Sequence, residues 1–172
     1  MVYRIQVGEK PQSKTVKMLL NKSVFMYAKV PTYHLIGARA LERVGFHLID
    51  TSVVFEKKMM STYDSSGEVV VRFAQPEDEN QVVAVASTSF IYSRFHLDPE
   101  IPNNIANTVK TEWVRNYFRG QRGDQMIVAL IDNQIVGFNQ LLFDQDRILT
   151  IDLIAVDTKY HRKGIAGVVL TC

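Results

Sequence analysis

Apolar and polar residues alternate in some segments of the chain and repeat at helical spacing in others. In the N-terminal part, segments rich in β-branched or aromatic residues predict strands at residues 2–7, 24–30 and 46–55. Residues 32–44 carry apolar residues three and four positions apart, which predicts a helix with Thr32 as its N-cap and Gly45 just after its end. Residues 10–21 fit neither period. The N-terminal part is therefore expected to contain a strand, a helix and a strand within residues 24–55.

A polar stretch then interrupts the pattern, and a longer series of elements follows it. Residues 61–67 are predicted to form a linker, which divides the chain into residues 1–60 and 68–172. The pattern next predicts a strand at 68–73, a helix from Pro76 to about Phe90 and a second helix from Pro102 to Gly120. Three apolar runs with short polar turns predict an antiparallel meander at residues 125–131, 135–143 and 148–156, and a last helix begins within residues 164–170.

Composition narrows the class of protein. The chain of 172 residues is 47% apolar and 22% charged, which is typical of a soluble globular protein and excludes a disordered or collagen-like chain. The formal net charge of +2 is too small to indicate a nucleic-acid or anionic-membrane partner, and no segment has the length of a membrane helix or the pattern of a signal peptide. One cysteine excludes a cysteine-based metal cage and fits a reducing compartment, so the expected location is the cytoplasm and no metal is expected.

One local pattern predicts a binding site. The predicted strand 148–156 runs into a basic turn with a glycine, and the turn opens a helix. Backbone N–H groups converge at such a turn, so it can hold an anion such as a diphosphate. Three neighbouring side chains supply further donors: His161, Arg162 and Lys163. The alternative interpretation is an ordinary capped helix N-terminus.

The residues of this turn are similar to a known signature. Residues 154–166, IAVDTKYHRKGIA, resemble the acetyl-CoA-binding signature of the GNAT superfamily of N-acyltransferases. His161 stands where that family has Gln or Arg, and Arg162 stands where it often has Gly. The resemblance implies that acetyl-CoA is bound by Ile154, Ala155, Val156, His161, Arg162, Lys163, Gly164, Ile165 and Ala166.

The order of elements between residues 68 and 156 also matches the first half of the GNAT fold. The resemblance therefore implies an α+β protein with α/β/α layers around a mixed sheet. Residues 68–172 would form the first half of a GNAT domain that stops just after the start of the CoA-binding helix. Residues 1–60 would form a half-GNAT lobe in front of it.

A closer likeness comes from residues 39–48, 87–96 and 113–120, which resemble the TDP-fucosamine acetyltransferases of enterobacterial common antigen synthesis. It implies transfer of an acetyl group from acetyl-CoA to a primary amine, with a TDP-linked amino sugar as the small-molecule acceptor. Two alternatives stay open. The chain could be a non-catalytic module that binds CoA or a partner protein. Residues 24–55 could also complete the sheet beside strand 148–156, either within the chain or from a second copy in a homodimer.

The resemblance also suggests residues for catalysis and acceptor binding. Asp152 occupies the place where many relatives keep a carboxylate base, and its alternative is a strand carboxylate that faces solvent or Arg147. The acceptor site would be lined by Arg94, His96 and Trp113. For His96 the alternative is a structural hydrogen bond, and for Trp113 it is the core, given its helical phase with Val109 and Tyr117.

Overall fold

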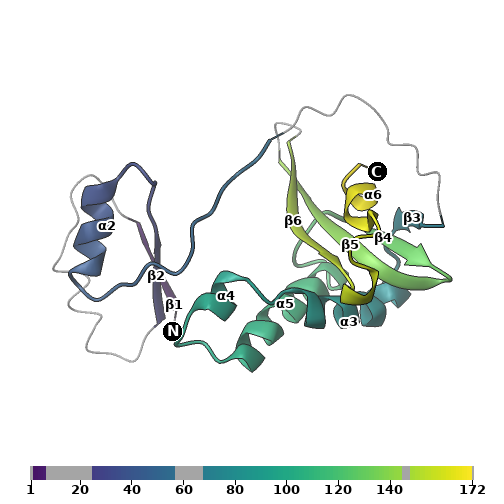
Figure 1. The fold of residues 1–172 in the computed structure, drawn as a ribbon, viewed down its shortest axis with the longest axis horizontal. Coiled ribbons are helices and arrows are strands. Elements are labelled where there is room, and N and C mark those ends of the chain that lie inside the picture. The colour runs from purple at the N-terminus through teal and green to yellow at the C-terminus, as the bar shows by residue number, and fades with distance from the viewer. Residues whose placement is uncertain (1, 7–24, 57–67, 145–147, 172) are drawn as a thin grey trace. The chain divides into compact units, whose positions relative to one another are not determined.

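The computed structural model describes residues 2–6, 25–56, 68–144 and 148–171. The chain divides into two compact units, Met1–Thr51 and Ser52–Cys172. Figure 1 labels the elements, which form a two-stranded sheet and a four-stranded sheet. The ambiguous segment 10–21, the expected linker 61–67 and Arg147 lie outside the described residues.

In the N-terminal unit two parallel strands precede one helix. Strand β1 (Val2–Gln6) pairs with β2 (Phe25–Lys29), and helix α2 (Leu35–Glu42) follows. The N-cap is His34 rather than Thr32, while Gly45 takes a φ of +92° after the helix end, as its position in the sequence predicts.

The prediction of a strand at residues 46–55 is wrong. This segment has no regular structure, and Val54 and Phe55 are 89% and 91% exposed. β-branched and aromatic residues form a strand only where a neighbouring strand accepts their backbone hydrogen bonds, and no described strand pairs with this segment. Strand β2 pairs with β1, and the pairing of residues 24–30 with strand 148–156 within the chain stays a prediction. The version of that pairing with a second copy likewise stays a prediction.

The C-terminal unit is built on the predicted meander. Strands β3 (Val70–Phe73), β4 (Gln125–Ile131), β5 (Gln134–Phe143) and β6 (Leu149–Val156) lie in the order β3-β4-β5-β6, and every neighbouring pair is antiparallel. The turn between β4 and β5 has positive φ at Asp132 and Asn133, the geometry of a tight hairpin turn. The described sheet is thus antiparallel rather than mixed, and with its helices it gives an α+β fold.

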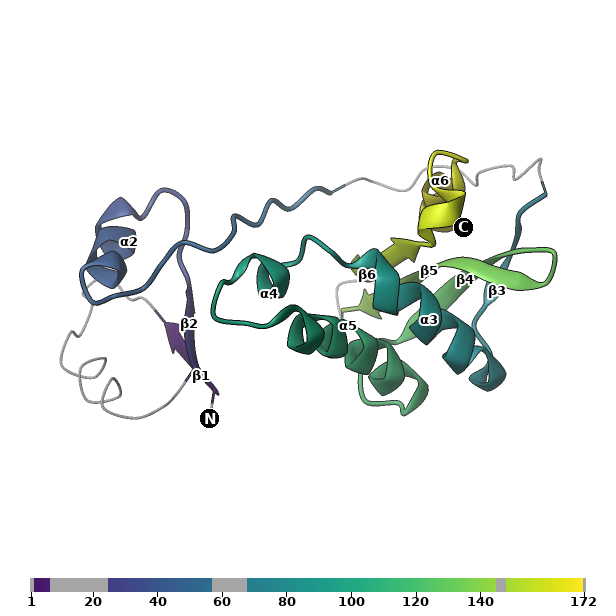
Figure 2. The ribbon, with the colours of Figure 1, turned by 60° about the horizontal axis from the view of Figure 1, so that its bottom comes forward.

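Helices cover both faces of this sheet. Helix α3 (Glu79–Ser89), the short α4 (Arg94–Leu97) and α5 (Asn103–Phe118) precede β4, and α6 (Ile165–Thr171) follows β6. Figure 2 shows α3 and α5 on one face and α6 on the other. The larger core packs α3 and α5 against the sheet through residues such as Val82, Val114, Met126 and Phe138, and the smaller core under α6 contains Val136, Ile165 and Val169. None of the helices in the described part of the chain has the length and apolar character needed to cross a membrane.

A short 3-10 turn, η1 (Pro76–Asp78), leads into α3 and is fixed by a buried ion pair. Asp78 is 3% exposed, and its carboxylate accepts from Arg72 Nη1 at 2.6 Å and from Nη2 at 2.9 Å. The backbone N–H of Gln75 donates to Asp78 Oδ2 at 2.7 Å. The Arg72 guanidinium is the main cause that lowers the pKa of Asp78 below its ordinary value.

Strand β6 carries a β-bulge that decides where one candidate residue points. Leu153 lies opposite Gln140 and Ile151 lies opposite Leu141, so Asp152 has no residue opposite it on β5. The extra residue changes the alternation of side chains between the two faces. Asp152 therefore points to the α5 face with Leu153, whereas Ile154 and Val156 face α6.

Candidate functional site

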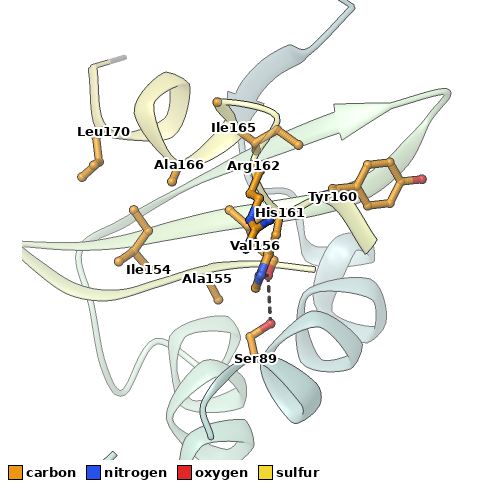
Figure 3. Close-up of a pocket in the computed structure, with 11 residues that line it drawn as sticks. Ser89, Ile154, Ala155, Val156, Tyr160, His161, Arg162, Ile165, Ala166 and Leu170 are labelled. Atoms are coloured by element: carbon orange, nitrogen blue, oxygen red, sulfur yellow. Dashed lines mark hydrogen bonds between the residues drawn. The ribbon is translucent and has the colours of Figure 1, made fainter. Parts of the chain in front are cut away.

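A pocket of about 620 Å³ lies at the end of β6, beside the basic turn and α6 (Figure 3). It is lined by Ser89, Ile154, Ala155, Val156, Tyr160, His161, Arg162, Gly164, Ile165, Ala166 and Leu170. All the cofactor-binding residues expected from the sequence are among them except Lys163, whose ammonium lies 5.0 Å from the ring centroid of Tyr160. The predicted segment thus does form one concave surface.

The turn itself has an unusual backbone. After the 3-10 turn η2 (Thr158–Tyr160), which Asp157 caps through the N–H of Lys159, the chain takes positive φ at Arg162 (+62°) and Gly164 (+76°). Glycine adopts this conformation freely, whereas arginine does so at a cost of about 1 kcal/mol. This backbone conformation places the long cationic side chain of Arg162 at the pocket wall.

The outer edge of β6 faces the pocket with backbone groups that no described strand pairs. Val156 lies opposite Gly137, and the neighbouring Asp157 N–H donates to Val136 O at 2.8 Å. Hydrogen-bonded and non-hydrogen-bonded pairs alternate along an antiparallel ladder, so the N–H and C=O groups of Val156 and Ile154 point away from β5. No described strand pairs with that edge. It can therefore pair with an extended ligand that carries amide groups.

Two side chains contact the carbonyl of Val156, one from the basic turn and one from α3. His161 Nε2 lies 2.9 Å from Val156 O, and the hydroxyl of Ser89 donates to the same oxygen at 3.3 Å and to Val85 O at 2.7 Å. Figure 3 shows Ser89 reaching the strand from α3. Ser89, Tyr160 and Leu170 line the pocket but were not predicted from the sequence; no local signal marks Ser89, which is 67 positions from Val156.

Helix α6 is held against the sheet by buried contacts. Asn139 Nδ2 donates to Val169 O at 2.9 Å, and the side chain of Ile165 is 1% exposed. A Cβ at Gly137 would lie 3.3 Å from Ile165 Cγ2 and 3.1 Å from Ala155 O, so the helix and β6 approach closely because this position has no side chain. These contacts fix the distance between the turn and the strand edge.

Asp152 belongs to a buried polar group on the opposite, α5 face. Its Oδ1 accepts from Arg122 Nη2 at 2.6 Å, and its Oδ2 accepts from Arg122 Nε at 2.7 Å and from Gln140 Nε2 at 2.8 Å. The carboxylate side chain is only 10% exposed. The structural alternative considered for Asp152 was a contact with solvent or Arg147, but the partner is Arg122. Oδ1 accepts one hydrogen bond and Oδ2 accepts two, so the carboxylate is held in one orientation while Oδ1 keeps a further lone pair.

Next to this ion pair, three aromatic rings and three cations lie together. The rings, which we call the aromatic wall, are Phe90, Phe95 and Trp113. Lys110 Nζ lies 4.4 Å from the centroid of Trp113, and the Arg122 guanidinium lies 4.0 Å from the same ring. Arg94 stacks on Phe95 at 4.9 Å. Trp113 is therefore partly buried: it packs against the larger core, and its ring also contacts Lys110 and Arg122.

His96 holds α4 against α5. Its Nδ1 lies 2.7 Å from Ser93 Oγ, and its Nε2 lies 2.8 Å from Asn107 Oδ1. With both ring nitrogens engaged, the histidine positions the short helix that carries Arg94 and Phe95. This geometry matches the structural alternative for His96.

Gly123 lies close to Gln140, which donates a hydrogen bond to Asp152, and a side chain at this position would crowd Gln140. The φ of Gly123 is +82°, and an added Cβ would lie 3.0 Å from Gln140 Cγ and 3.1 Å from Tyr117 Cδ2. We expect Gly123→Ala to lower the free energy of unfolding by about 2 kcal/mol, measured by urea denaturation, because it adds crowding to backbone strain. Gly120→Ala is the matched control: φ is +68° and nothing lies within 4 Å, so about 1 kcal/mol is expected. Equal losses in the two variants would contradict the crowding.

Comparisons with known proteins find a family match in the C-terminal unit. Residues 95–171 match the model of the acetyltransferase (GNAT) family. The spore coat polysaccharide biosynthesis protein SpsD of Bacillus subtilis is 26% identical over 148 residues, which cover 86% of this chain and 50% of that protein. The chain thus spans about half the length of this curated relative.

Solved structures of similar proteins include a GNAT-family acetyltransferase from Bacillus cereus, with 20% identity, a TM-score of 0.42, and coverage of 60% of this chain and 61% of that one. The PaiA N-acetyltransferase of Thermoplasma acidophilum, in complex with coenzyme A, has 17% identity, a TM-score of 0.42, and coverage of 59% and 67%. The family model spans every pocket-lining residue except Ser89, and it supports the acetyltransferase (GNAT) family for residues 95–171.

Proposed function

We propose that this chain binds acetyl-CoA in the pocket at the end of β6 and takes part in acetyl transfer to a primary amine. The observation that carries the proposal is the combination in one pocket of an unpaired strand edge at Ile154 and Val156 with the basic turn from His161 to Gly164. A ligand with a diphosphate at one end and amide groups along its length is complementary to both features.

Different residues would bind the two parts of acetyl-CoA: the turn would bind the diphosphate, and the edge of β6 would bind the pantetheine arm. The turn offers the Arg162 guanidinium, which can bind phosphate oxygens at two points, and the backbone of Gly164. The N–H groups of Ile154 and Val156 can bind amide oxygens along the pantetheine arm. One of these two N–H groups would instead bind the thioester oxygen and stabilise the negative charge that develops on it when the amine attacks.

For the reaction to proceed, the attacking amine must lose a proton. Asp152 is the proposed base, and accepting the proton would remove the negative charge that it shares with Arg122. In a competing role, Asp152 holds Arg122 in place and a water molecule takes the proton. Replacement by Asn distinguishes the two, because an essential base would lower kcat at every acceptor concentration, whereas loss of positioning would mainly raise KM.

The proposed acceptor is an amino sugar, and a nucleotide-linked one such as a TDP-amino sugar is the leading candidate. The relative from Bacillus subtilis is named for polysaccharide biosynthesis, which is consistent with a carbohydrate acceptor. Arg94 and Trp113 lie on the aromatic wall, on the α5 face of the sheet, while Ser89, which precedes Phe90 of that wall, lines the pocket. The two regions are therefore adjacent along the chain at Ser89 and Phe90.

The test of CoA binding is thermal unfolding with and without CoA. A ligand at 100 times its dissociation constant stabilises a protein by about 2.7 kcal/mol, so a clear rise in Tm is expected. Arg162→Gln should weaken CoA binding about tenfold, because it removes a charged phosphate donor. Lys159→Gln removes the same charge from the neighbouring 3-10 turn outside the pocket lining, and should change binding by less than about twofold.

The same variants show how the proposal fails. Absence of a CoA-dependent Tm shift in the unsubstituted chain, or an equal loss in the two variants, would refute the pocket assignment. If CoA binds, release of its thiol in the presence of acetyl-CoA and TDP-amino sugars tests transfer. Binding without thiol release would favour the alternative of a non-catalytic CoA-binding module.

A further inference from the structure

The cations that lie against the aromatic wall outnumber the carboxylates paired with them among the described residues. Arg94, Lys110 and Arg122 all stack on its rings, and Asp152 is the single carboxylate that forms an ion pair with any of them among the described residues. With one negative charge for three positive ones, this group, which we call the cationic cluster, is left with a local charge of +2. Concentrated, partly buried cations of this kind repel one another unless an anion joins them.

Lys110 lies at the centre of these rings and cations. Its ammonium lies within 5.8 Å of the ring centroids of Phe90, Phe95 and Trp113 and forms no ion pair in the described chain. Burial is the main cause that lowers the pKa of Lys110; Arg94 and Arg122 lower it further, and Asp152 opposes the shift. The ring faces favour a cation beside them, and a bound anion would offset the cost of burying the ammonium.

The arginines have donors left for a ligand. Arg122 uses Nε and Nη2 on Asp152, and no hydrogen bond of its Nη1 is present among the described residues. Arg94 stacks on Phe95 and likewise binds no described carboxylate. The His96 contacts to Ser93 and Asn107 fix the helix that carries Arg94, so its position relative to α5 is set before any ligand arrives.

We propose that the cationic cluster of Arg94, Lys110 and Arg122 binds a phosphate group of the acceptor molecule. A phosphate or diphosphate carries about two negative charges and matches the local excess, whereas a single carboxylate would leave one positive charge uncompensated. The apolar rings of the aromatic wall lower the polarity beside the cations, which would strengthen each of these contacts. The inference rests on the proposed acetyltransferase function and narrows its acceptor to phosphorylated amines.

The position of the cluster suits an acceptor that reaches toward the cofactor pocket. Ser89 lines that pocket, and the next residue, Phe90, belongs to the aromatic wall. Asp152, which is bound to Arg122, is two residues from Ile154 at the pocket. A phosphate held on the cluster would therefore leave the rest of the acceptor free to extend along β6 toward Val156.

The chain contains its own reporter for this site, because Trp113 is the single tryptophan in the sequence. The experiment is a titration of the CoA-loaded full chain with inorganic pyrophosphate at constant ionic strength, followed by Trp113 fluorescence. CoA keeps pyrophosphate from the turn at Arg162, and constant ionic strength removes general screening effects. We expect a saturable change in Trp113 emission, and a smaller response to phosphate or acetate at the same concentration.

Matched variants assign the response. Lys110→Gln and Arg94→Gln should each weaken pyrophosphate binding about tenfold, since each removes a charged donor. Lys110→Arg should keep most of the affinity and shows that loss in the glutamine variant reflects charge rather than packing. Arg115→Gln removes the same charge from the exposed, Glu112-paired side of α5 and should leave binding unchanged.

Several results would overturn the inference: no change in Trp113 emission, equal weakening in Arg115→Gln, or a response to acetate as strong as that to pyrophosphate. The Tm shift with CoA is measured on the same samples. A chain that binds CoA without a Trp113 response refutes the phosphate site alone, whereas a chain without a CoA shift refutes the proposed function.

Discussion

Replacing Arg122 by methionine is expected to lower the free energy of unfolding by about 3 kcal/mol, because it strands a carboxylate that is nearly excluded from water. Asp152 is 10% exposed, and Arg122 supplies the 2.6 Å and 2.7 Å hydrogen bonds that hold it. Methionine keeps much of the length of the side chain and its contact with Trp113, so the loss reports the charge rather than a cavity. Urea denaturation at neutral pH measures it.

A double-mutant cycle separates the ion pair from packing. Asp152→Asn keeps the shape of the side chain and removes its charge, so the double variant should be more stable than the sum of the single losses predicts, by about 2 kcal/mol. Strictly additive losses would show that Arg122 acts through its stacking on Trp113 and that the ion pair contributes little.

The second large effect concerns Asp78 and depends on pH. Asp78→Asn should cost about 2.5 kcal/mol at neutral pH, because Arg72 loses a charged, bidentate partner that is 3% exposed. The pKa of Asp78 is lowered in the folded chain, so its stabilising contribution is complete above the ordinary value of 3.8 and is lost as pH falls through the folded pKa.

This sign gives a measurable profile. The free energy of unfolding of the unsubstituted chain should fall steeply below about pH 4, whereas that of Asp78→Asn should fall less over the same range. Glu77→Gln, an exposed neighbour in the same turn, is the control and should keep the profile of the unsubstituted chain. A parallel fall in Asp78→Asn would show that other carboxylates cause the acid sensitivity.

Much of the C-terminal unit was predictable because its signals are local. The three strands of the meander are apolar runs between short polar turns, and β4 matches its predicted range of 125–131. The strand expected at 46–55 failed for the complementary reason. Its residues favour a strand, but the hydrogen bonds of a strand come from a neighbour that the sequence does not reveal.

The candidate site divides in the same way. The pocket residues of β6 and the basic turn are contiguous in the sequence, so one motif identifies most of them. Ser89, Arg94 and Lys110 come from α3, α4 and α5, and Arg122 comes from the loop between α5 and β4, so only the packing of these elements brings them together. Lys110 has no sequence feature that distinguishes it from a surface lysine.

The bulge at Asp152 has a consequence for alignment with other proteins. Residues 149–151 and residues 153–156 are out of phase by one position, because Asp152 is an extra residue in β6. Alignment with a strand that lacks the bulge must therefore open a one-residue gap opposite Asp152. Without that gap, the carboxylate would be compared with a residue on the other face of the sheet, and an equivalent acid in a relative would be sought in the wrong place.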